Sequence, residues 1–288
     1  MSHAQLITCE QLAIRLSQPE VFLLDCRFAL DDPAYGRKAY EAGHLPGAHF
    51  LDLEKDLSGP VVPGQTGRHP LPAPNILSQR LAGLGLNSDS HVVIYDDGNG
   101  SYAARAWWAL FWLGKQESVA LLDGGLSAWK QAGGLITADE PAVEPGDFIG
   151  RPDPALVVDA QTVHAALGTP GLTLIDARAP TRFRGEAEPI DPVAGHVPGA
   201  SCWPFTENLD EQGRFKTVEQ LRERFARLAP EQREVIAYCG SGVTACHNLF
   251  AMSLAGFPVG KLYAGSWSEW ITDPQRPIAS GDGPAEAK

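Results

Sequence analysis

Short, almost wholly apolar runs alternate with longer amphipathic stretches along the chain. Runs of this kind predict strands of a parallel sheet that is covered on both faces. Their alternation with helical stretches predicts open, mostly parallel α/β sheets with helices on both faces. The expected strands are Val21–Cys26, Val92–Tyr95, Val119–Leu122, Leu172–Asp176, Val235–Tyr238 and Lys261–Tyr263.

Two of the amphipathic stretches begin with a capping box, in which the first and fourth residues satisfy each other's backbone groups. Thr8 and Gln11 form one such pair, and Thr217 and Gln220 form the other. A further helix is expected to start near Thr244, directly after a predicted strand.

The sequence contains an internal repeat. "AGHLPGAHF" (42–50) is echoed by "AGHVPGASC" (194–202), "HVVIYDDGNGSYAARAWWAL" (91–110) by "EVIAYCGSGVTACHNLFAM" (234–252), and "GGLSAWKQAGG" (124–134) by "GSWSEWITDPQ" (265–275). Blocks repeated in the same order at a domain-sized spacing predict a duplicated domain. We expect domains at residues 1–137 and 156–288, joined by a linker at 138–155 within a Pro-rich and acidic stretch.

Composition narrows the classes of function. The chain has 288 residues, 44% of them apolar, and a net charge of −12, which argues against nucleic acid or an anionic membrane surface as a partner. No run approaches the length of a membrane span, and the N-terminus lacks the pattern of a secretory signal. Five widely spaced cysteines indicate reduced thiols in the cytoplasm, and no group of residues has the spacing of a metal or cofactor site.

Cys239 stands where a predicted strand ends and a helix begins, a position at which α/β sheets place ligands. The loop Gly240-Ser241-Gly242-Val243-Thr244 contains two glycines, so it can curl and turn its amides inward as an anion-binding nest. The positive end of the following helix adds to this field. A cysteine there is favoured as a thiolate, which is the nucleophilic form. The alternative is a small buried hydrophobe, which suits Cys246 and the other cysteines better. In the first half, Asp96 takes the place of Cys239.

The motifs "GHLPGA", "GHVPGA", "CGSGVTA" and "GSWSEW" resemble those of the two-domain rhodaneses and 3-mercaptopyruvate sulfurtransferases. The resemblance covers roughly residues 6–278 and implies two tandem rhodanese-like domains with the site in the cleft between them. It implies that Cys239 takes sulfur from a small-molecule donor as a persulfide. Cyanide or a thiol such as glutathione or thioredoxin would then accept that sulfur. The duplication supplies both facing domains, so a monomer is expected.

The identity of the donor rests on charge near the cysteine. Thiosulfate-specific members of the family usually carry two basic residues after the cysteine, whereas Gly240 and Ser241 are neutral. This loop is similar to that of the 3-mercaptopyruvate branch, which makes 3-mercaptopyruvate the favoured donor and thiosulfate the alternative. By resemblance, Arg182 binds the donor carboxylate, although an exposed salt bridge is the simpler interpretation. A second arginine common in that branch is replaced by Ile190, and Arg184 is a possible substitute.

Other residues have weaker signals. Resemblance places Tyr102 and Phe205 at the cleft, and His44 and His196 are expected to stabilise turns. Buried pairing with Asp25 or Asp176 is expected for Arg27, Arg105 and Arg178.

Two other classes of function remain to be compared. A cysteine phosphatase would need an arginine at the sixth position after the cysteine, where this chain has Ala245. A non-catalytic rhodanese-like binding protein would suit the first half, but Cys239 argues against it for the whole chain.

Overall fold

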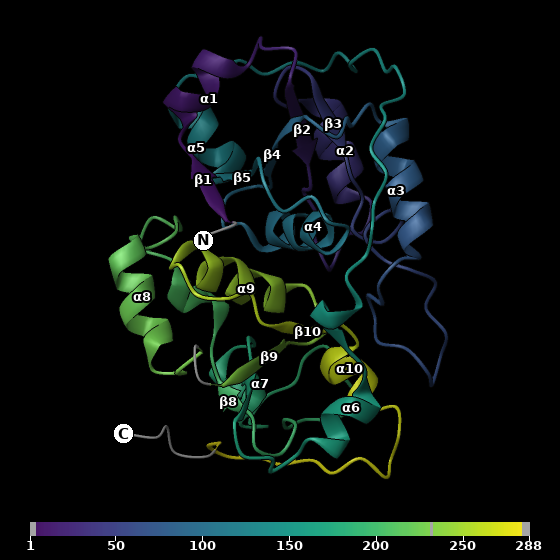
Figure 1. Ribbon diagram of the computed structural model, residues 1–288, viewed down its shortest axis with the longest axis vertical. Helices are drawn as coiled ribbons and strands as arrows, with labels where there is room; N and C mark the ends of the chain where they lie inside the picture. Colours follow the sequence, from purple (N-terminus) through teal and green to yellow (C-terminus); the bar gives the residue numbers. More distant parts are fainter. Residues whose placement is uncertain (1–3, 231–232, 284–288) are drawn as a thin grey trace.

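In the computed structural model, which describes residues 4–230 and 233–283, ten strands form two parallel sheets of five strands (Figure 1). The orders β1-β5-β4-β2-β3 and β6-β10-β9-β7-β8 are the same arrangement repeated. The expected fold class is therefore confirmed. The strands are β1 (Gln5–Ile7), β2 (Val21–Asp25), β3 (Ala48–Phe50), β4 (His91–Tyr95), β5 (Val119–Leu122), β6 (Val157–Val158), β7 (Leu172–Asp176), β8 (Ser201–Cys202), β9 (Glu234–Tyr238) and β10 (Lys261–Tyr263).

Helices cover both faces of each sheet. Successive strand residues point to opposite sides, and both sides are apolar, so both must be covered. Val92 and Ile94 pack with α4, whereas Val93 packs on the opposite face with α1 and α5. The helices are α1 (Cys9–Arg15), α2 (Tyr35–Ala42), α3 (Pro74–Gly83), α4 (Ser101–Trp112), α5 (Gly125–Gln131), α6 (Ala160–Ala165), α7 (Pro180–Phe183), α8 (Val218–Ala226), α9 (Thr244–Leu254) and α10 (Ser266–Trp270), with 3-10 turns η1 (Pro154–Leu156) and η2 (Phe205–Asn208).

Local sequence explains several element ends. Thr8 and Gln11 form the expected capping box at α1, and Thr217 and Gln220 form the one at α8. The expected start near Thr244 is the first residue of α9. Four strands, β1, β3, β6 and β8, were not predicted, because two or three residues at a sheet edge are too few to show a pattern.

The two domains share one hydrophobic core. In Figure 1, α4 and α9 lie side by side at the centre of the molecule, between the two sheets. Trp107 of α4 meets Phe250 of α9 edge to face, with ring centroids 5.1 Å apart. Both helices follow the carboxyl end of a central strand, so this packing brings the loops before them to the domain interface. Among the described residues, none of the helices combines the length and the apolar character that crossing a membrane would require.

Candidate active site

Cys239 directly follows β9, and the loop to α9 folds around its sulfur. Gly242 has a φ of +77°, and a side chain there would collide with the carbonyl oxygen of Ala264, so only glycine fits. The Gly242 amide donates a hydrogen bond to Cys239 Sγ at 3.1 Å. Cys239 is only 2% exposed, and it lines a cavity of about 330 Å³. The thiol is therefore held by the loop at the wall of a ligand-sized cavity.

The other amides of the loop are those expected to form the anion cradle. In the described part of the chain, the backbone N–H groups of Gly240, Ser241, Val243 and Thr244 donate to no protein acceptor. The α9 helix, eleven residues long, begins at Thr244 and adds its positive end. Inward-facing amides and the positive end of a helix are groups that bind anions.

The segment before α10 fixes the backbone of the loop. Trp267 N–H donates to the carbonyl oxygen of Cys239 at 3.0 Å, and Ser268 N–H donates to that of Gly240 at 2.9 Å. The hydroxyl of Ser266 accepts from the Cys239 amide at 3.1 Å and donates to the carbonyl oxygen of Tyr263 at 2.9 Å. Ser266 adopts a φ of 57°, a conformation unusual for a residue other than glycine. The "GSWSEW" motif therefore serves to hold the cysteine loop.

The first domain contributes a histidine that sequence reasoning missed. His69 Nδ1 lies 2.8 Å from Ser241 Oγ, although the two residues are 172 positions apart. Burial, with the charges of Arg105 and Arg68, lowers the pKa of His69 to about 3. The imidazole is therefore neutral at physiological pH and can exchange a proton with Ser241. His69 lies in the aperiodic segment "TGRHPLP", and its residue type was the only available signal.

Arg105 was expected to pair with a buried aspartate, and that expectation is wrong. Its guanidinium is fully buried and donates to three carbonyl oxygens, those of Gly242 at 3.0 Å, Leu57 at 3.1 Å and His69 at 3.2 Å. No carboxylate among the described residues pairs with it. Arg105 thus ties the first domain to the cysteine loop and places an unneutralised positive charge behind it. The other two expected pairs, Arg27 with Asp25 and Arg178 with Asp176, are present.

Arg182 reaches the same cavity while forming ion pairs. It lies in α7, and its side chain is 15% exposed. Nε donates to Glu188 at 2.9 Å and Nη2 donates to Asp191 at 3.0 Å. Arg68 of the first domain pairs with the same carboxylate of Asp191. These ion pairs are not the exposed salt bridge of the simpler interpretation, because their carboxylates are only 3% exposed. Arg182 and Arg68 both line the cavity beside Cys239.

Other sequence-predicted residues fall into two groups. Tyr102, Phe205 and Ile190 line the cavity, as does the cysteine loop. Arg184 does not line it, because its guanidinium pairs with Glu186 at the surface, 2.6 Å away. His44 and His196 support turns as expected. Each stacks on an aromatic ring 3.8 Å away, Tyr40 and Phe183 respectively, and each places Nδ1 against the carbonyl oxygen of that same residue.

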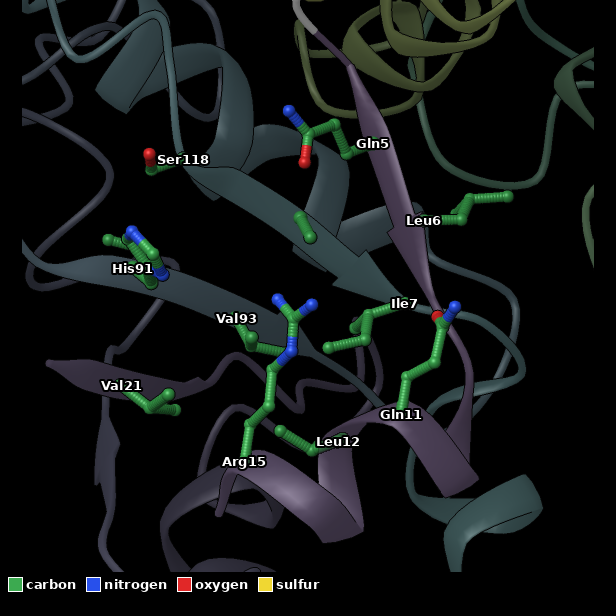
Figure 2. A pocket seen from close by; sticks show the side chains of 12 residues that line it. Gln5, Leu6, Ile7, Gln11, Leu12, Arg15, Val21, His91, Val93 and Ser118 are labelled. Carbon is green, nitrogen blue, oxygen red and sulfur yellow. The ribbon is translucent and has the colours of Figure 1, made fainter. Parts of the chain in front are cut away.

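A second pocket, of about 280 Å³, lies against the sheet of the first domain between α1 and the strands β1, β4 and β5. Figure 2 shows Arg15 extending from α1 toward Val93 and Ile7 on the sheet, with His91 nearby. The pocket contains no thiol and no residue of the cysteine loop. Among the described residues, no three His, Cys, Asp or Glu side chains are grouped as metal ligands.

Comparisons with known proteins match both halves of the chain to one domain family and the whole chain to proteins named as sulfurtransferases. A profile of the "Rhodanese-like domain" matches residues 8–132 and 159–273. A "Probable 3-mercaptopyruvate sulfurtransferase" of Pseudomonas aeruginosa is 63% identical over 98% of this chain and 100% of its own. A "Putative thiosulfate sulfurtransferase SseB" of Mycobacterium tuberculosis is 41% identical over 96% of this chain and 97% of its own. The crystal structure of SseA from Escherichia coli, described as a 3-mercaptopyruvate sulfotransferase, has a TM-score of 0.78 and 34% identity, covering 92% of this chain and 100% of that one.

Proposed function

Because this chain belongs to the rhodanese family, with both halves matching its domain, we propose that it is a 3-mercaptopyruvate sulfurtransferase. The name of the relative that is 63% identical along its whole length supports this activity, in agreement with the interpretation of the sequence. The proposed site comprises Cys239 as nucleophile, the loop Gly240-Ser241-Gly242-Val243-Thr244 as anion cradle, and Arg182 as donor-binding residue.

One observation carries the proposal. Within residues 4–230 and 233–283, the Cys239 sulfur accepts one hydrogen bond, from Gly242, and the amides of Gly240, Ser241, Val243 and Thr244 have no protein acceptor. Inward-facing amides around a buried atom, here called an amide bowl, favour a thiolate. The amides of this bowl that have no acceptor are available to a second sulfur atom. The cavity next to it, about 330 Å³, is large enough for a three-carbon donor.

In the first step, the Cys239 thiolate attacks the sulfur of 3-mercaptopyruvate. A sulfur–sulfur bond forms and the donor's carbon–sulfur bond breaks, with its electron pair passing to the carbon and into the adjacent carbonyl as an enolate. The enzyme then carries a persulfide, and the enolate takes one proton to become pyruvate. The covalent intermediate divides the transfer into two easier steps.

Ser241 and His69 are placed to handle that proton. The Ser241 hydroxyl borders the cavity and lies 2.8 Å from His69 Nδ1. Ser241 donates a proton to the enolate, and His69 replaces it while taking a solvent proton at its other ring nitrogen. The imidazole stays neutral throughout, which agrees with its pKa of about 3. Proton transfer by positioned groups of this kind contributes about 10²–10⁴ in rate.

In the second step, an acceptor attacks the outer sulfur of the persulfide. A thiolate such as that of glutathione or thioredoxin becomes a persulfide, and cyanide becomes thiocyanate. In either reaction the sulfur–sulfur bond at Cys239 breaks and its electron pair returns to the cysteine as thiolate. The two steps therefore return the enzyme to its starting state, and neither step uses a cofactor.

Thiosulfate is the second candidate donor. The loop residues after Cys239 are neutral, but the guanidinium groups of Arg68 and Arg182 lie beside Gly240. These cations favour an anionic donor of either type. The Mycobacterium tuberculosis relative carries a thiosulfate name.

The organisation of the chain completes the proposal. Domains at 1–137 and 156–288 are supported by the two sheets, whose strands lie at 5–122 and 157–263. A monomer is supported by the shared core of α4 and α9, which gives each half its partner within one chain. Five free cysteines support a reducing compartment such as the cytoplasm.

A direct test compares donors on the purified protein. With 3-mercaptopyruvate we expect one pyruvate for each sulfur transferred, and a 32-dalton adduct (one sulfur atom) on the peptide that carries Cys239. The kcat/KM for 3-mercaptopyruvate should exceed that for thiosulfate. A clear preference for thiosulfate would replace the donor and retain the persulfide, whereas absence of the adduct with both donors would refute sulfur transfer through Cys239.

A further inference from the structure

Two arginines from different domains converge on one point of the cavity. A methyl group built on Gly240 would lie 2.9 Å from Arg68 Nη2 and 3.5 Å from both Nη1 and Nη2 of Arg182. Gly240 is the residue that follows Cys239. Both guanidinium groups therefore lie beside the reacting sulfur, and the absence of a side chain at position 240 leaves room for them.

Two acidic residues of the second domain orient both arginine side chains. Asp191 pairs with Nη1 of Arg68 and with Nη2 of Arg182. Glu188 further fixes Arg182 through Nε. Arg68 pairs through Nη1 and keeps Nη2 beside Gly240, whereas Arg182 has both Nη1 and Nη2 beside Gly240 and uses Nη2 for its acids. The acids therefore position the two side chains and leave Arg68 Nη2 and Arg182 Nη1 at the cysteine loop.

The inner nitrogens keep their hydrogen-bonding capacity. In the described part of the chain, Arg68 Nη2 and Arg182 Nη1 donate to no acceptor. Arg68 Nε is also buried without a partner. Unsatisfied guanidinium donors in a partly buried cavity are costly, and a carboxylate is the group that best satisfies them.

The backbone holds Arg68 in this place. Its amide donates to Ser268 Oγ at 3.1 Å, across the domain interface. Gly67 packs so closely on Gly265 that a side chain there would collide with the Gly265 carbonyl group. The segment that carries Arg68 is therefore docked against the same turn that holds the Cys239 backbone, which makes the position of the guanidinium part of the site.

We propose that Arg68 is a specificity-determining residue that forms, with Arg182, a two-arginine clamp for the carboxylate of the donor. This proposal rests on the proposed function. Arg68 binds through Nη2 and Arg182 through Nη1, and the carboxylate lies over Gly240 with the donor sulfur directed at Cys239. The first domain thereby supplies half of the donor recognition, in addition to His69.

The test measures 3-mercaptopyruvate turnover and pyruvate binding in parallel. Pyruvate retains the carboxylate and lacks the sulfur, so calorimetric titration with pyruvate reports on the clamp without turnover. For Arg68→Ala we expect the KM for 3-mercaptopyruvate and the Kd of pyruvate each to rise about tenfold or more, with kcat reduced less than about threefold, as for loss of one charge-assisted hydrogen bond.

Arg184→Ala is the matched control, because Arg184 is two residues from Arg182 but pairs with Glu186 outside the cavity. It should leave KM and Kd unchanged. Ile190 lines the cavity and is 44% exposed, so an arginine at that position has room to reach the carboxylate. The double variant Arg68→Ala/Ile190→Arg should recover part of the lost affinity, which a merely structural role of Arg68 would not allow.

The outcomes are distinct. Unchanged KM and Kd in Arg68→Ala would overturn the clamp, and so would a fall in kcat alone, which would mean that Arg68 only positions His69. If the wild-type protein does not turn over 3-mercaptopyruvate, the proposed function fails, while the pyruvate titration still decides whether Arg68 binds a carboxylate. Should Arg68→Ala not fold, Arg68→Lys keeps the charge toward Asp191 and loses the second donor, and its KM and Kd should lie between those of the wild type and a full loss.

Discussion

The loops after β4 and β9 have the same place in their domains, but a different side chain lies at the centre of each. In each, a buried tyrosine ends the strand, and the helix begins six residues after it, at Ser101 or Thr244. In the first loop, the carboxylate of Asp96 accepts from four amides, those of Gly98, Gly100 and Tyr102 at 3.0 Å and Ala103 at 3.3 Å. In the second, Cys239 Sγ accepts from one amide.

Burial does not distinguish the two loops. Asp96 and Cys239 are each only 2% exposed. What differs is whether the amide bowl is filled by the chain itself. The carboxylate of Asp96 accepts from four amides of its loop, whereas the thiol of Cys239 leaves most amides of its loop without a protein acceptor among the described residues.

The loops also differ in what the opposite domain brings to them. His69 meets Ser241 of the second loop, and Phe215 packs against the first, 3.1 Å from a methyl group built on Gly100. Phe215 also stacks on His247 with ring centroids 4.5 Å apart. A histidine ring thus contacts the cysteine loop, and a phenylalanine ring packs against the aspartate loop.

The largest effect should come from filling the second bowl. In Cys239→Asp, the new carboxylate can take the loop amides as Asp96 does, so we expect a folded protein with turnover more than about 1000-fold below wild type. Its Tm should equal or exceed that of the wild type. Cys246→Ala, which removes the other thiol of this region, should keep most of the activity. Residual persulfide transfer in Cys239→Asp would contradict the role of the thiol.

Emptying the first bowl should instead affect stability. Asp96→Ala leaves four buried amides without their acceptor, and we expect unfolding to become easier by about 3 kcal/mol or more. Urea denaturation would measure this, with Asp97→Ala as control, because Asp97 bonds Tyr35 and not the bowl. The kcat of the folded variant should stay near wild type. A stability unchanged from wild type would show that the Asp96 bowl contributes nothing to the fold.

Exchanging the interface rings tests the proton path. His69→Phe copies the counterpart Phe215, and we expect kcat with 3-mercaptopyruvate to fall about 100-fold. Turnover with thiosulfate should fall much less, because its leaving group, sulfite, needs no proton. His164→Phe, on the exposed side of α6, is the control. Equal losses with both donors would indicate that His69 only shapes the loop.

The smallest expected effect is a pH dependence of stability. His247 Nε2 lies 3.0 Å from the Asn99 carbonyl oxygen and Nδ1 lies 3.1 Å from Asn208 Nδ2, so both nitrogens are used by the neutral ring. Burial lowers the pKa of His247 to about 4 from an ordinary 6.5. Between these values the unfolded chain binds more protons, so stability from this group is full above pH 6.5 and is lost as the pH falls toward 4. The Tm should drop by several degrees from pH 7 to pH 5, with a shallower slope in His247→Gln; equal slopes would exclude His247 as the cause.

Much of this architecture could be read from the sequence. The repeated motifs predicted the rhodanese family and the two α/β domains, which are confirmed. The capping residues Thr8 and Thr217 marked helix starts correctly, because capping depends on neighbours within four positions. The donor-binding role of Arg182 and the roles of the loop residues stay predictions, as do the domain boundaries at 137 and 156.

What the sequence could not provide are contacts between the halves. His69 and Ser241 meet across 172 positions, and Arg105 meets the Gly242 carbonyl group across 137. Nothing local separates Arg105 from the buried arginines that pair with aspartate, and "TGRHPLP" has no periodicity. Such contacts depend on how α4 packs on α9, which no local pattern encodes.

The residues around the cavity come from both domains, and this has a consequence for how the protein is made. The half that carries His69, Arg68 and Arg105 leaves the ribosome before the half that carries the thiol, and domains fold as they emerge. Until the later half docks on that finished surface, Ser241 therefore lacks its contact with His69, and the Cys239 loop lacks the Arg105 guanidinium behind it. The loop amides and the start of α9 belong to the later half itself, so docking completes the surroundings of Cys239 rather than creating them.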